Sequence, residues 1–492
     1  MKPPGGAPAA PRRPRRTRLI VACVTLALAG AALFARSAGE LEHVSGAAPA
    51  AVSAPLASAP VVDAPFATAA EAPGPPPAPL SPPPTPPPAH RLRPLIYGYD
   101  LPLHMREPCL WPLTCKLHAA AASSPHRTLD GDEADYFWIP HKMPVDNETE
   151  LRAILRIVVE EHPWFNASAT ARHIMVFSCD HGPSPCTWET QPCDNEQGLA
   201  AWPAAVNPAS RERRLMFLSL NGVRDGADAG GGCCLGCFQR GRDIVVPPFT
   251  PGRDWDPDRS RATKLSPWLA SGEEEQAFVE RGTPRDGAPR RDVLLWFAGA
   301  LAAGLNPETD RSGRAAVFAA FGSPDARDDA RPPLKLEVLD TLRAPRGDKS
   351  TTFEDWAPRS LFCLDAMGTH GGWAARVVAL LYYGCVPLNT RPADVALIFD
   401  EHPAVDWALF SVAAPSPLGP DYNDTLRAAL AAARAPAELK QRRAAARLVF
   451  TRFLWSSLSP GGDVAGEPTG GHERDAWQTL LEILATRLQT AT

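Results

Sequence analysis

The segment 359–387 constrains the fold more than any other part of the chain. An apolar run, a cluster of glycines, a helical pattern and a second apolar run follow one another within it. Short apolar runs that end near glycine are typical of buried strands, and a helix between two such strands makes the βαβ unit of a parallel sheet. The predicted elements are a strand at 361–364, a turn with Gly368, Gly371 and Gly372, a helix at 373–383 and a strand at 385–388.

The glycine-rich turn of this unit is a candidate phosphate site. The first turn of a helix presents unpaired N–H groups and a partial positive charge, and glycine lets the backbone approach an anion closely. Arg376 lies about one turn into the predicted helix, where its guanidinium can fork onto phosphate oxygens, and His370 lies in the turn itself. The alternative is that the glycines serve only the geometry of the turn, with Arg376 and His370 as solvated surface residues.

The segment also resembles the exostosin family of glycosyltransferases. That family carries a pattern like R-S-x-F-C-L-x-P-x-G, followed by S-x-R-x-x-[DE]-A and then by G-C-[IV]-P-[VL]. The resemblance spans roughly residues 93–412, because other family-like blocks occur in the family's order. Those blocks lie at 96–102, 133–140, 243–249, 295–299 and 406–408. The matching residues of the segment itself are Arg359, Ser360, Phe362, Cys363, Leu364, Gly368, Arg376, Gly384, Cys385, Val386 and Pro387.

Two sets of alternating strands and helices predict an α/β protein with two parallel sheets and a cleft between them. The resemblance implies the same architecture, the GT-B fold of two Rossmann-like domains facing a cleft. A polar stretch at 253–291 separates the two sets. The predicted domains are an N-terminal Rossmann-like, acceptor-side domain at 93–285, a C-terminal Rossmann-like nucleotide-sugar domain at 286–455 and a helical tail at 456–492.

Apolar periodicity outside the segment predicts the other elements of these domains. The expected strands lie at 95–99, 136–139, 174–177, 215–220, 244–246, 293–297 and 334–339. The expected helices lie at 148–162, 313–321, 425–433, 438–455 and 473–488.

The resemblance implies an activity, which is the transfer of a sugar, with inversion, from a nucleotide-diphosphate sugar as co-substrate to a glycan or glycoprotein acceptor. In that reaction Arg376 is expected to stabilise the diphosphate leaving group as charge develops. Arg359 precedes the first strand of the segment and is expected to pair with the same phosphates or with a carboxylate elsewhere. The predicted nucleotide-sugar residues are Arg359, Gly368, His370, Gly371, Gly372 and Arg376.

An inverting transferase needs a base that takes the proton of the acceptor hydroxyl. Asp180 and His181 follow the strand predicted at 174–177 and resemble a D-x-G block of the family. Because the carboxyl ends of strands line the ligand crevice of an open α/β sheet, either residue is the expected base. The alternative is a turn-forming or capping role for both.

The chain departs from the family pattern at one position of the helix. The family has an acidic residue three positions after Arg376, suited to bind donor ribose, whereas this chain has Ala379. The candidate substitutes for that acid are Glu354, Asp355 and Asp365. The departure leaves an alternative function open, in which the fold is kept without catalysis as a glycan-binding or partner subunit of a transferase complex. Nucleotide affinity separates the two functions.

No metal and no cofactor other than the co-substrate are expected, because the resemblance implies that the helix dipole and Arg376 take the place of a cation. Two patterns offer alternatives. The run 254–258 contains a D-x-D pattern, although it lies in the polar stretch, and the run 233–237 superficially resembles a zinc knuckle.

The N-terminus predicts a membrane anchor. A basic tail at 1–18 precedes the apolar run 19–35, whose length is at the short end of the ~17–25 residues of a membrane span and suits a thin internal membrane. The basic flank should stay in the cytosol, so we expect a single-pass type II protein of the Golgi membrane with its bulk in the lumen. The stretch 36–92, rich in proline and alanine, is expected to be an extended stem. A cleavable signal peptide is the alternative.

Sequons and cysteines agree with a lumenal location. Asn147, Asn166 and Asn423 begin N-x-[ST] sequons and are candidate glycosylation sites. One of the 11 cysteines, Cys23, lies in the apolar run, which leaves an even number for disulfides of unknown connectivity. The net charge of −5 does not favour nucleic acid. The expected partners are a nucleotide sugar, a glycan or glycoprotein acceptor, the membrane, and other transferases in a hetero-oligomer.

Overall fold

The computed structural model divides the chain into two compact units, Met1–Pro82 and Pro83–Thr492, and the described residues all lie in the second unit. The predicted tail, anchor and stem lie outside the described residues. Among the residues that are described, no helix is long and apolar enough to cross a membrane. The described residues are 93–107, 112–142, 148–167, 172–177, 213–220, 222, 238–248, 265–270, 272–299, 314, 316–317, 335–340, 353–366, 375–390, 395–414, 422–455 and 474–490.

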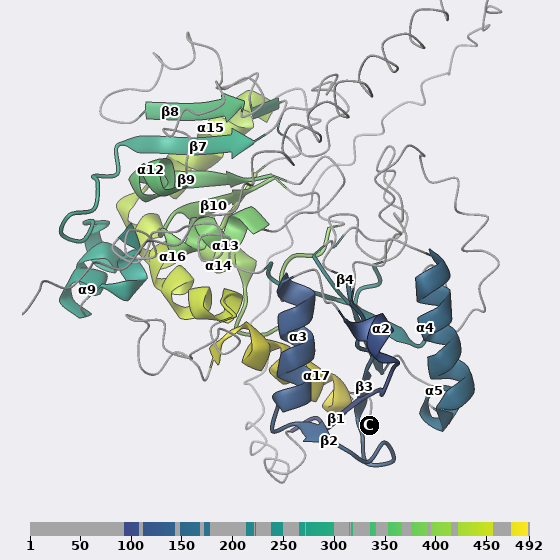
Figure 1. The fold of residues 1–492 in the computed structure, drawn as a ribbon. Coiled ribbons are helices and arrows are strands. Elements are labelled where there is room, and N and C mark those ends of the chain that lie inside the picture. The colour runs from purple at the N-terminus through teal and green to yellow at the C-terminus, as the bar shows by residue number, and fades with distance from the viewer. Residues whose placement is uncertain are drawn as a thin grey trace, which may run out of the picture. The chain divides into compact units, whose positions relative to one another are not determined.

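The first sheet contains six parallel strands in the described part of the chain (Figure 1). Their order is β2-β1-β3-β4-β5-β6, so the chain passes from β1 outward to β2 and then returns across β1 to β3. All later strands add on that second side. The strands are β1 (Ile96–Gly98), β2 (Arg127–Thr128), β3 (Tyr136–Trp138), β4 (His173–Phe177), β5 (Leu215–Ser219) and β6 (Ile244–Val245).

The second sheet is wound in the same way. Its described strands are also all parallel and lie in the order β11-β10-β9-β7-β8, so that β7 is flanked by β8 on one side and by β9 on the other. The structure thus confirms an α/β fold with two parallel sheets, each with one switch point, β1/β3 and β7/β9. The predicted cleft between the sheets stays a prediction. The strands are β7 (Val293–Gly299), β8 (Lys335–Asp340), β9 (Ser360–Asp365), β10 (Val386–Asn389) and β11 (Val412–Ala413).

Both faces of the first sheet are covered by helices. All residues of β4 are buried. Ile174 and Val176 belong to one apolar cluster with α3 (Pro112–Ser123), and Met175 and Phe177 belong to another with α4 (Glu148–Glu161) and α5 (Pro163–Ala167). Successive side chains of a strand point to opposite faces, so a strand between two helical layers has a continuous apolar run.

Most of the predicted helices are present. The pattern at 148–162 is confirmed as α4, and the pattern at 438–455 corresponds to an α-helix followed by a 3-10 turn. The alanine-rich α3 was not predicted, and of the helix predicted at 313–321 only residues 314, 316 and 317 are described. The remaining elements are α2 (Leu103–Arg106), η2 (Pro267–Leu269), α9 (Gly272–Arg281), α12 (Phe353–Trp356), η4 (Ala357–Arg359), α13 (Ala375–Tyr382), α14 (Trp407–Phe410), α15 (Tyr422–Ala433), α16 (Pro436–Val449), η5 (Phe450–Phe453) and α17 (Ala476–Thr490).

The end of the predicted polar connection packs against helices that follow it in sequence. The Ser266 hydroxyl donates a hydrogen bond to the Tyr382 carbonyl over 2.7 Å, and Trp268 Nε1 donates to the Leu381 carbonyl over 2.6 Å. Helix α9 contacts α16. These contacts associate η2 and α9 with the helices of the second sheet, although both precede the domain boundary predicted after residue 285, which stays a prediction.

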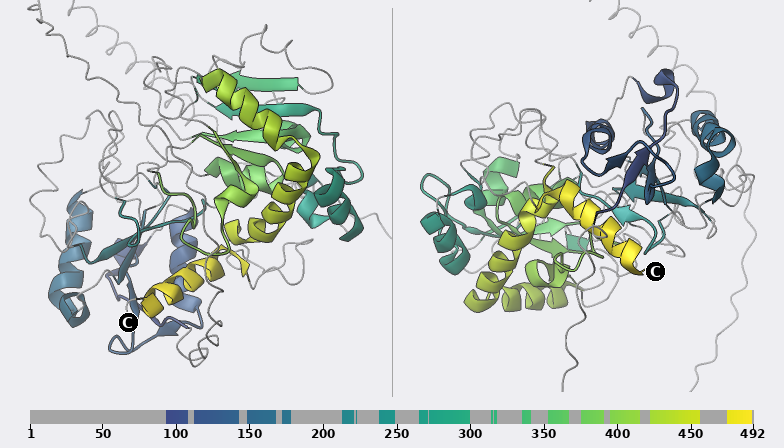
Figure 2. Two further views of the ribbon diagram at one scale, coloured as in Figure 1. Left: turned by 180° about the vertical axis from the view of Figure 1, so that it is seen from behind. Right: turned by 90° about the horizontal axis from the view of Figure 1, so that it is seen from below.

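The C-terminal helix α17 returns to the first sheet (Figure 2). The Tyr136 hydroxyl in β3 donates to the Leu484 carbonyl over 2.9 Å, and the Trp138 and Trp477 rings lie 6.1 Å apart. The helix itself was predicted at 473–488, but its partner was not. Helix α17 therefore packs against the first sheet, although the helices before it in sequence pack against the second sheet.

Candidate functional site

The segment 359–387 folds as the predicted βαβ unit of the second sheet. Strand β9 leads through the glycine turn into α13, and β10 pairs with β9 in parallel, with Val386 opposite Phe362 and Asn389 opposite Asp365. The turn itself, with Gly368, His370, Gly371 and Gly372, lies outside the described residues. Strand β9 borders the switch point with β7, and doubly wound sheets bind ligands beyond the carboxyl ends of the strands at such a point.

Arg376 is the second residue of α13. This position puts its backbone in the first turn of the helix, where N–H groups have no helical partner and the dipole is positive. Nothing is described of its side chain. From Val377 onward the helix is buried on every side, so the chain has a rigid support directly behind the first turn.

A disulfide and a glycine hold the far end of the unit. Cys363 in β9 is bonded to Cys385, immediately before β10, which confirms disulfide formation for this pair. Gly384 has φ +70°, and a Cβ at this position would lie 2.6 Å from Pro267 Cγ and 2.7 Å from Phe278 Cζ. The G-C-V-P motif is therefore a left-handed glycine followed by a disulfide cysteine, and both residues fix how α13 joins β10.

Polar residues stand where β9 and β10 end. Asp365 is completely buried at the end of β9, and Thr390, which follows β10, is 1% exposed. The Thr390 N–H reaches the Asp365 carbonyl at 3.5 Å. The sequence indicated Asp365 only as a possible substitute for the missing acid and did not indicate Thr390. The signal for Thr390 was available, since it directly follows the second apolar run of the unit.

Arg359 lies at the opposite end of β9 from the glycine turn, roughly 20 Å of extended strand away. Its Nε donates to Asp292 Oδ1 over 2.8 Å, and Nη2 pairs with Asp292 Oδ2 at 2.5 Å. The guanidinium also lies 5.1 Å from the centre of the Trp356 ring. The sequence left two possible partners for Arg359, the phosphates of the donor or a carboxylate. The structure shows a carboxylate, that of Asp292.

Ala379 lies within the buried part of α13, at 7% exposure. Its carbonyl accepts a hydrogen bond from Tyr383 N over 3.2 Å. The methyl side chain offers no group for a ribose hydroxyl. No residue of α13 therefore supplies the acid of the family pattern. Asp365 is the carboxylate nearest in sequence before the turn.

The predicted base residues and sequons are only partly described. Asp180 and His181 lie outside the described residues, three and four positions after the end of β4 at Phe177. Asn147 also lies outside them. Asn166 is exposed in α5 and donates from Nδ2 to the Val159 carbonyl over 3.2 Å, and Asn423 is in α15 with a side chain that is not described.

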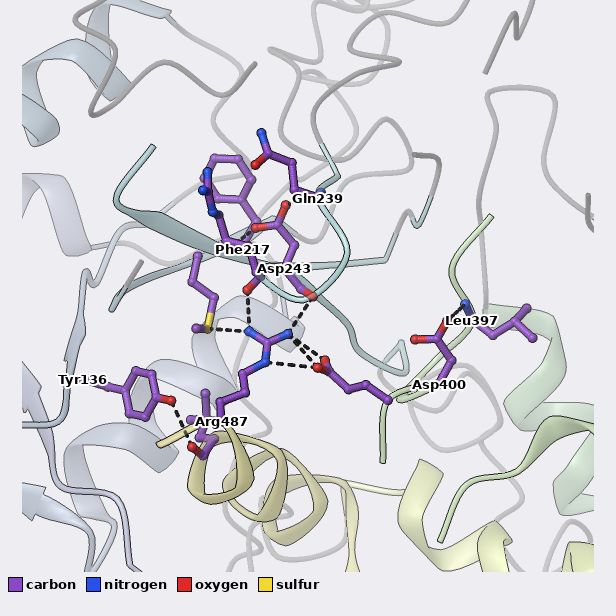
Figure 3. Close-up of polar contacts among 11 residues, drawn as sticks. Tyr136, Phe217, Gln239, Asp243, Leu397, Asp400 and Arg487 are labelled. Carbon is purple, nitrogen blue, oxygen red and sulfur yellow. Dashed lines mark hydrogen bonds and ion pairs between the residues drawn. The ribbon is translucent and has the colours of Figure 1, made fainter. Parts of the chain in front are cut away.

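A buried polar cluster joins α17 to the first sheet (Figure 3). Arg487 donates from Nη2 to both carboxylate oxygens of Glu401 at 2.7 and 2.8 Å, and to the Asp243 carbonyl over 3.0 Å. The Asp243 carboxylate pairs with Arg213, and both side chains are fully buried. Asp243 opens the family-like block 243–249, but the sequence did not show that its role is to hold Arg213 and the backbone N–H of Phe217.

The fold and the site define a class of protein. Both sheets are doubly wound, and in the second sheet β9 borders the switch point and leads to α13, whose second residue is Arg376, as in α/β proteins that bind nucleotides. The class therefore rests on the topology of the sheets and on the position of Arg376 in α13.

Comparison with known proteins is consistent with that class. The chain is 25% identical over 311 residues to a probable glucuronosyltransferase of Oryza sativa subsp. japonica, which covers 60% of this chain and 58% of the relative. It is 23% identical over 338 residues to the probable beta-1,4-xylosyltransferase IRX10 of Arabidopsis thaliana, covering 63% and 66%. A probable glucuronoxylan glucuronosyltransferase of the same plant is 24% identical over 345 residues, covering 64% and 60%.

These relatives are exostosin-family enzymes, so the comparisons confirm the family resemblance that the motifs of the segment indicate. The chain spans less than two thirds of the length of each of these three relatives. No protein-family model matches it.

Proposed function

We propose that this chain is a glycosyltransferase that moves a sugar from a nucleotide-diphosphate sugar to a glycan acceptor. The observation that carries the proposal is the position of the family motif in the structure. The motif follows β9, which borders the switch point of a doubly wound sheet, and its Arg376 is the second residue of α13. The glycosyltransferase relatives support the same activity.

The second sheet supplies the donor site in this proposal. The diphosphate lies against the glycine turn and the first N–H groups of α13, and Arg376 neutralises the charge that develops on the leaving group. Asp365 and Thr390 border the same edge and are placed to bind the donor's sugar or ribose hydroxyls. Arg359 has no part in it, because it is paired with Asp292 at the other end of β9.

The first sheet supplies the acceptor and the base. The acceptor hydroxyl attacks the anomeric carbon as the bond to the diphosphate breaks, which inverts that carbon, and its proton passes to Asp180 or His181. Both residues follow β4, so they lie beyond the carboxyl end of a central strand. The two sheets face each other across a cleft, as in a GT-B fold.

The setting follows from the N-terminus and the disulfide. The Cys363–Cys385 bond fits an oxidising compartment. We therefore propose a Golgi membrane protein with a lumenal catalytic domain, N-glycosylated at one or more of Asn147, Asn166 and Asn423, that can associate with other transferases. The names of two relatives refer to xylosyl transfer and to glucuronoxylan, so a plant-type xylan is the first acceptor to test.

A non-catalytic subunit is the second candidate, and Ala379 is the observation in its favour. The experiment that separates the two is a transfer assay of the purified full chain. UDP-xylose, UDP-glucuronate and UDP-galactose are offered with a reducing-end-labelled xylohexaose, and products are separated by mass. We expect one added sugar from one donor. This transfer should be lost in Arg376→Ala and kept in Arg434→Ala, because Arg434 is an exposed arginine directly after α15. Nucleotide binding without transfer to any acceptor in a wider glycan panel would favour the subunit.

A further inference from the structure

A pocket of about 620 Å³ opens beside the switch point of the first sheet. It follows β1 from Ile96 to Asp100, and it reaches Trp138 and Pro140 at the end of β3. Residues of α3 and of β2 complete its lining. Its volume is within the range of roughly 300–1,000 Å³ that holds a drug-sized ligand, which is also the size of an oligosaccharide end.

The floor of the pocket is open because β1 ends in glycine. Gly98 is exposed, and a Cβ built on it would meet no atom within 4 Å. Ala119 and Ala122 line the pocket from α3, together with His118 and with Cys115, which is bonded in a disulfide. The hollow is thus bordered by short side chains at Gly98, Ala119 and Ala122.

The rim of the pocket is polar and electrically balanced. Arg106 and Asp100 form a long ion pair of 3.5 Å, with 38% and 88% of their side chains exposed. Nε of Arg106 has no hydrogen-bond partner among the described residues. Glu107 and Arg127 add one further charge of each sign. Such a rim offers donors and acceptors for hydroxyl groups without selecting a charged ligand.

One apolar surface completes the rim. Leu129 lines the pocket with 80% of its surface exposed. His118, at the back of the pocket, is held as a neutral imidazole, because its Nδ1 accepts a hydrogen bond from Trp138 Nε1 over 2.7 Å. A pyranose ring has an apolar C–H face and a polar hydroxyl edge, and the pocket has a surface for each.

We propose that this pocket binds the end of a neutral oligosaccharide and is the acceptor subsite of the first sheet. The proposal rests on the proposed glycosyltransferase function and adds to it the place and the chemical class of the acceptor. An anionic nucleotide is not the expected ligand, because among the described lining residues two acids offset two arginines. Gly98 and Arg106 are the residues that determine what enters.

The test is binding of xylotetraose, a neutral probe, and of tetragalacturonate, an acidic probe of equal length, to the purified full chain by titration calorimetry. The variant Gly98→Leu fills the hollow, and φ at this position lies outside the left-handed region, so the fold tolerates a side chain. The matched control is Gly272→Leu, where an added Cβ also meets nothing within 4 Å. UDP, GDP and CMP are titrated into the same samples as a readout of the donor site.

We expect the wild type to bind xylotetraose at least tenfold more tightly than tetragalacturonate. Gly98→Leu should weaken xylotetraose binding at least tenfold, and Gly272→Leu should leave it unchanged, with nucleotide binding equal in all three proteins. Arg106→Met should weaken xylotetraose binding by a smaller factor.

Two results would overturn the proposal while the transferase function stands. One is nucleotide binding by a wild type that binds neither xylotetraose nor other neutral oligosaccharides, or that binds the acidic probe better. The other is unchanged xylotetraose affinity in Gly98→Leu. A wild type that binds no nucleotide and no oligosaccharide would instead contradict the transferase function, and the acceptor subsite with it.

Discussion

Cys363 and Cys385 are joined by a disulfide that encloses the glycine turn and the whole of α13 in a covalent loop. The two cysteines are 22 positions apart, and their backbones belong to neighbouring parallel strands. The bond therefore ties the strand before the predicted donor turn to the strand that follows α13.

Removal of this disulfide should lower the stability of the folded protein. In the chain-entropy account a loop of this length contributes about 3 kcal/mol to the free energy of unfolding. We expect Cys363→Ala/Cys385→Ala to lose about that much in urea denaturation. A double variant as stable as the wild type would show that the disulfide does not constrain the unit.

The glycine of the G-C-V-P motif is expected to be irreplaceable. Gly384→Ala combines a left-handed φ of +70° with overlaps onto Pro267, Phe278 and Arg291. Gly241 has φ +79° and no neighbour within 4 Å of an added Cβ, so Gly241→Ala is the matched control for backbone strain alone. We predict a loss of about 1 kcal/mol for the control and more than 3 kcal/mol for Gly384→Ala, measured by chemical denaturation. Equal losses would mean that the packing around Gly384 yields easily.

The ion pair between Arg487 and Glu401 should contribute to the attachment of α17. Burial raises the pKa of Glu401, against the opposing effect of Arg487, and their side chains are 25% and 14% exposed. Arg487→Met leaves this carboxylate and two backbone carbonyls without their donor, and we expect a loss of about 2–4 kcal/mol. The double variant Arg487→Met/Glu401→Gln should lose less than the sum of the two single variants. Additive losses would contradict a direct interaction.

Two buried histidines should make the protein acid-sensitive. Burial, as the main cause, lowers the pKa of His118 and of His173 to about 3, against an ordinary value of 6.5. The unfolded chain then binds more protons than the folded chain between about pH 3 and 6.5, so stability is full above that window and falls as the pH decreases through it. Each histidine should cost about 2 kcal/mol at pH 5 relative to pH 7.5.

The measurement for the histidines is urea denaturation at both pH values. His118→Gln should reduce the difference between them by about 2 kcal/mol, because glutamine does not titrate and can still accept from Trp138. Equal wild-type stability at pH 5 and 7.5 would show that these histidines are not held neutral.

Periodicity and turn chemistry were sufficient to predict the sheet strands of the βαβ unit, because buried parallel strands have continuous apolar runs and Gly384 marks a required left-handed turn. The same signals could not predict the partners of α17. The contact of Arg487 with Glu401 joins residues 86 positions apart, and nothing in either local pattern encodes it. Nor could they show that Arg359 pairs with Asp292, which lies 67 positions earlier in the chain.

The pocket at Gly98 was beyond sequence reasoning for a different reason. It is bordered by short side chains, those of Gly98 in β1 and of Ala119 and Ala122 in α3, and short side chains give no periodic signal. The alanine-rich helix that makes one wall was itself not predicted.

The measurement that tests the central claim most directly is titration calorimetry of the full chain with UDP, GDP and CMP, repeated on Arg376→Ala and Arg434→Ala. The account predicts saturable binding of one nucleotide, unchanged in Arg434→Ala and weaker by roughly 10- to 100-fold in Arg376→Ala, as expected for the loss of charged hydrogen bonds of about 1.5–3 kcal/mol. Absence of binding to all three nucleotides by folded protein, or equal affinity in Arg376→Ala, would contradict a donor site at the start of α13.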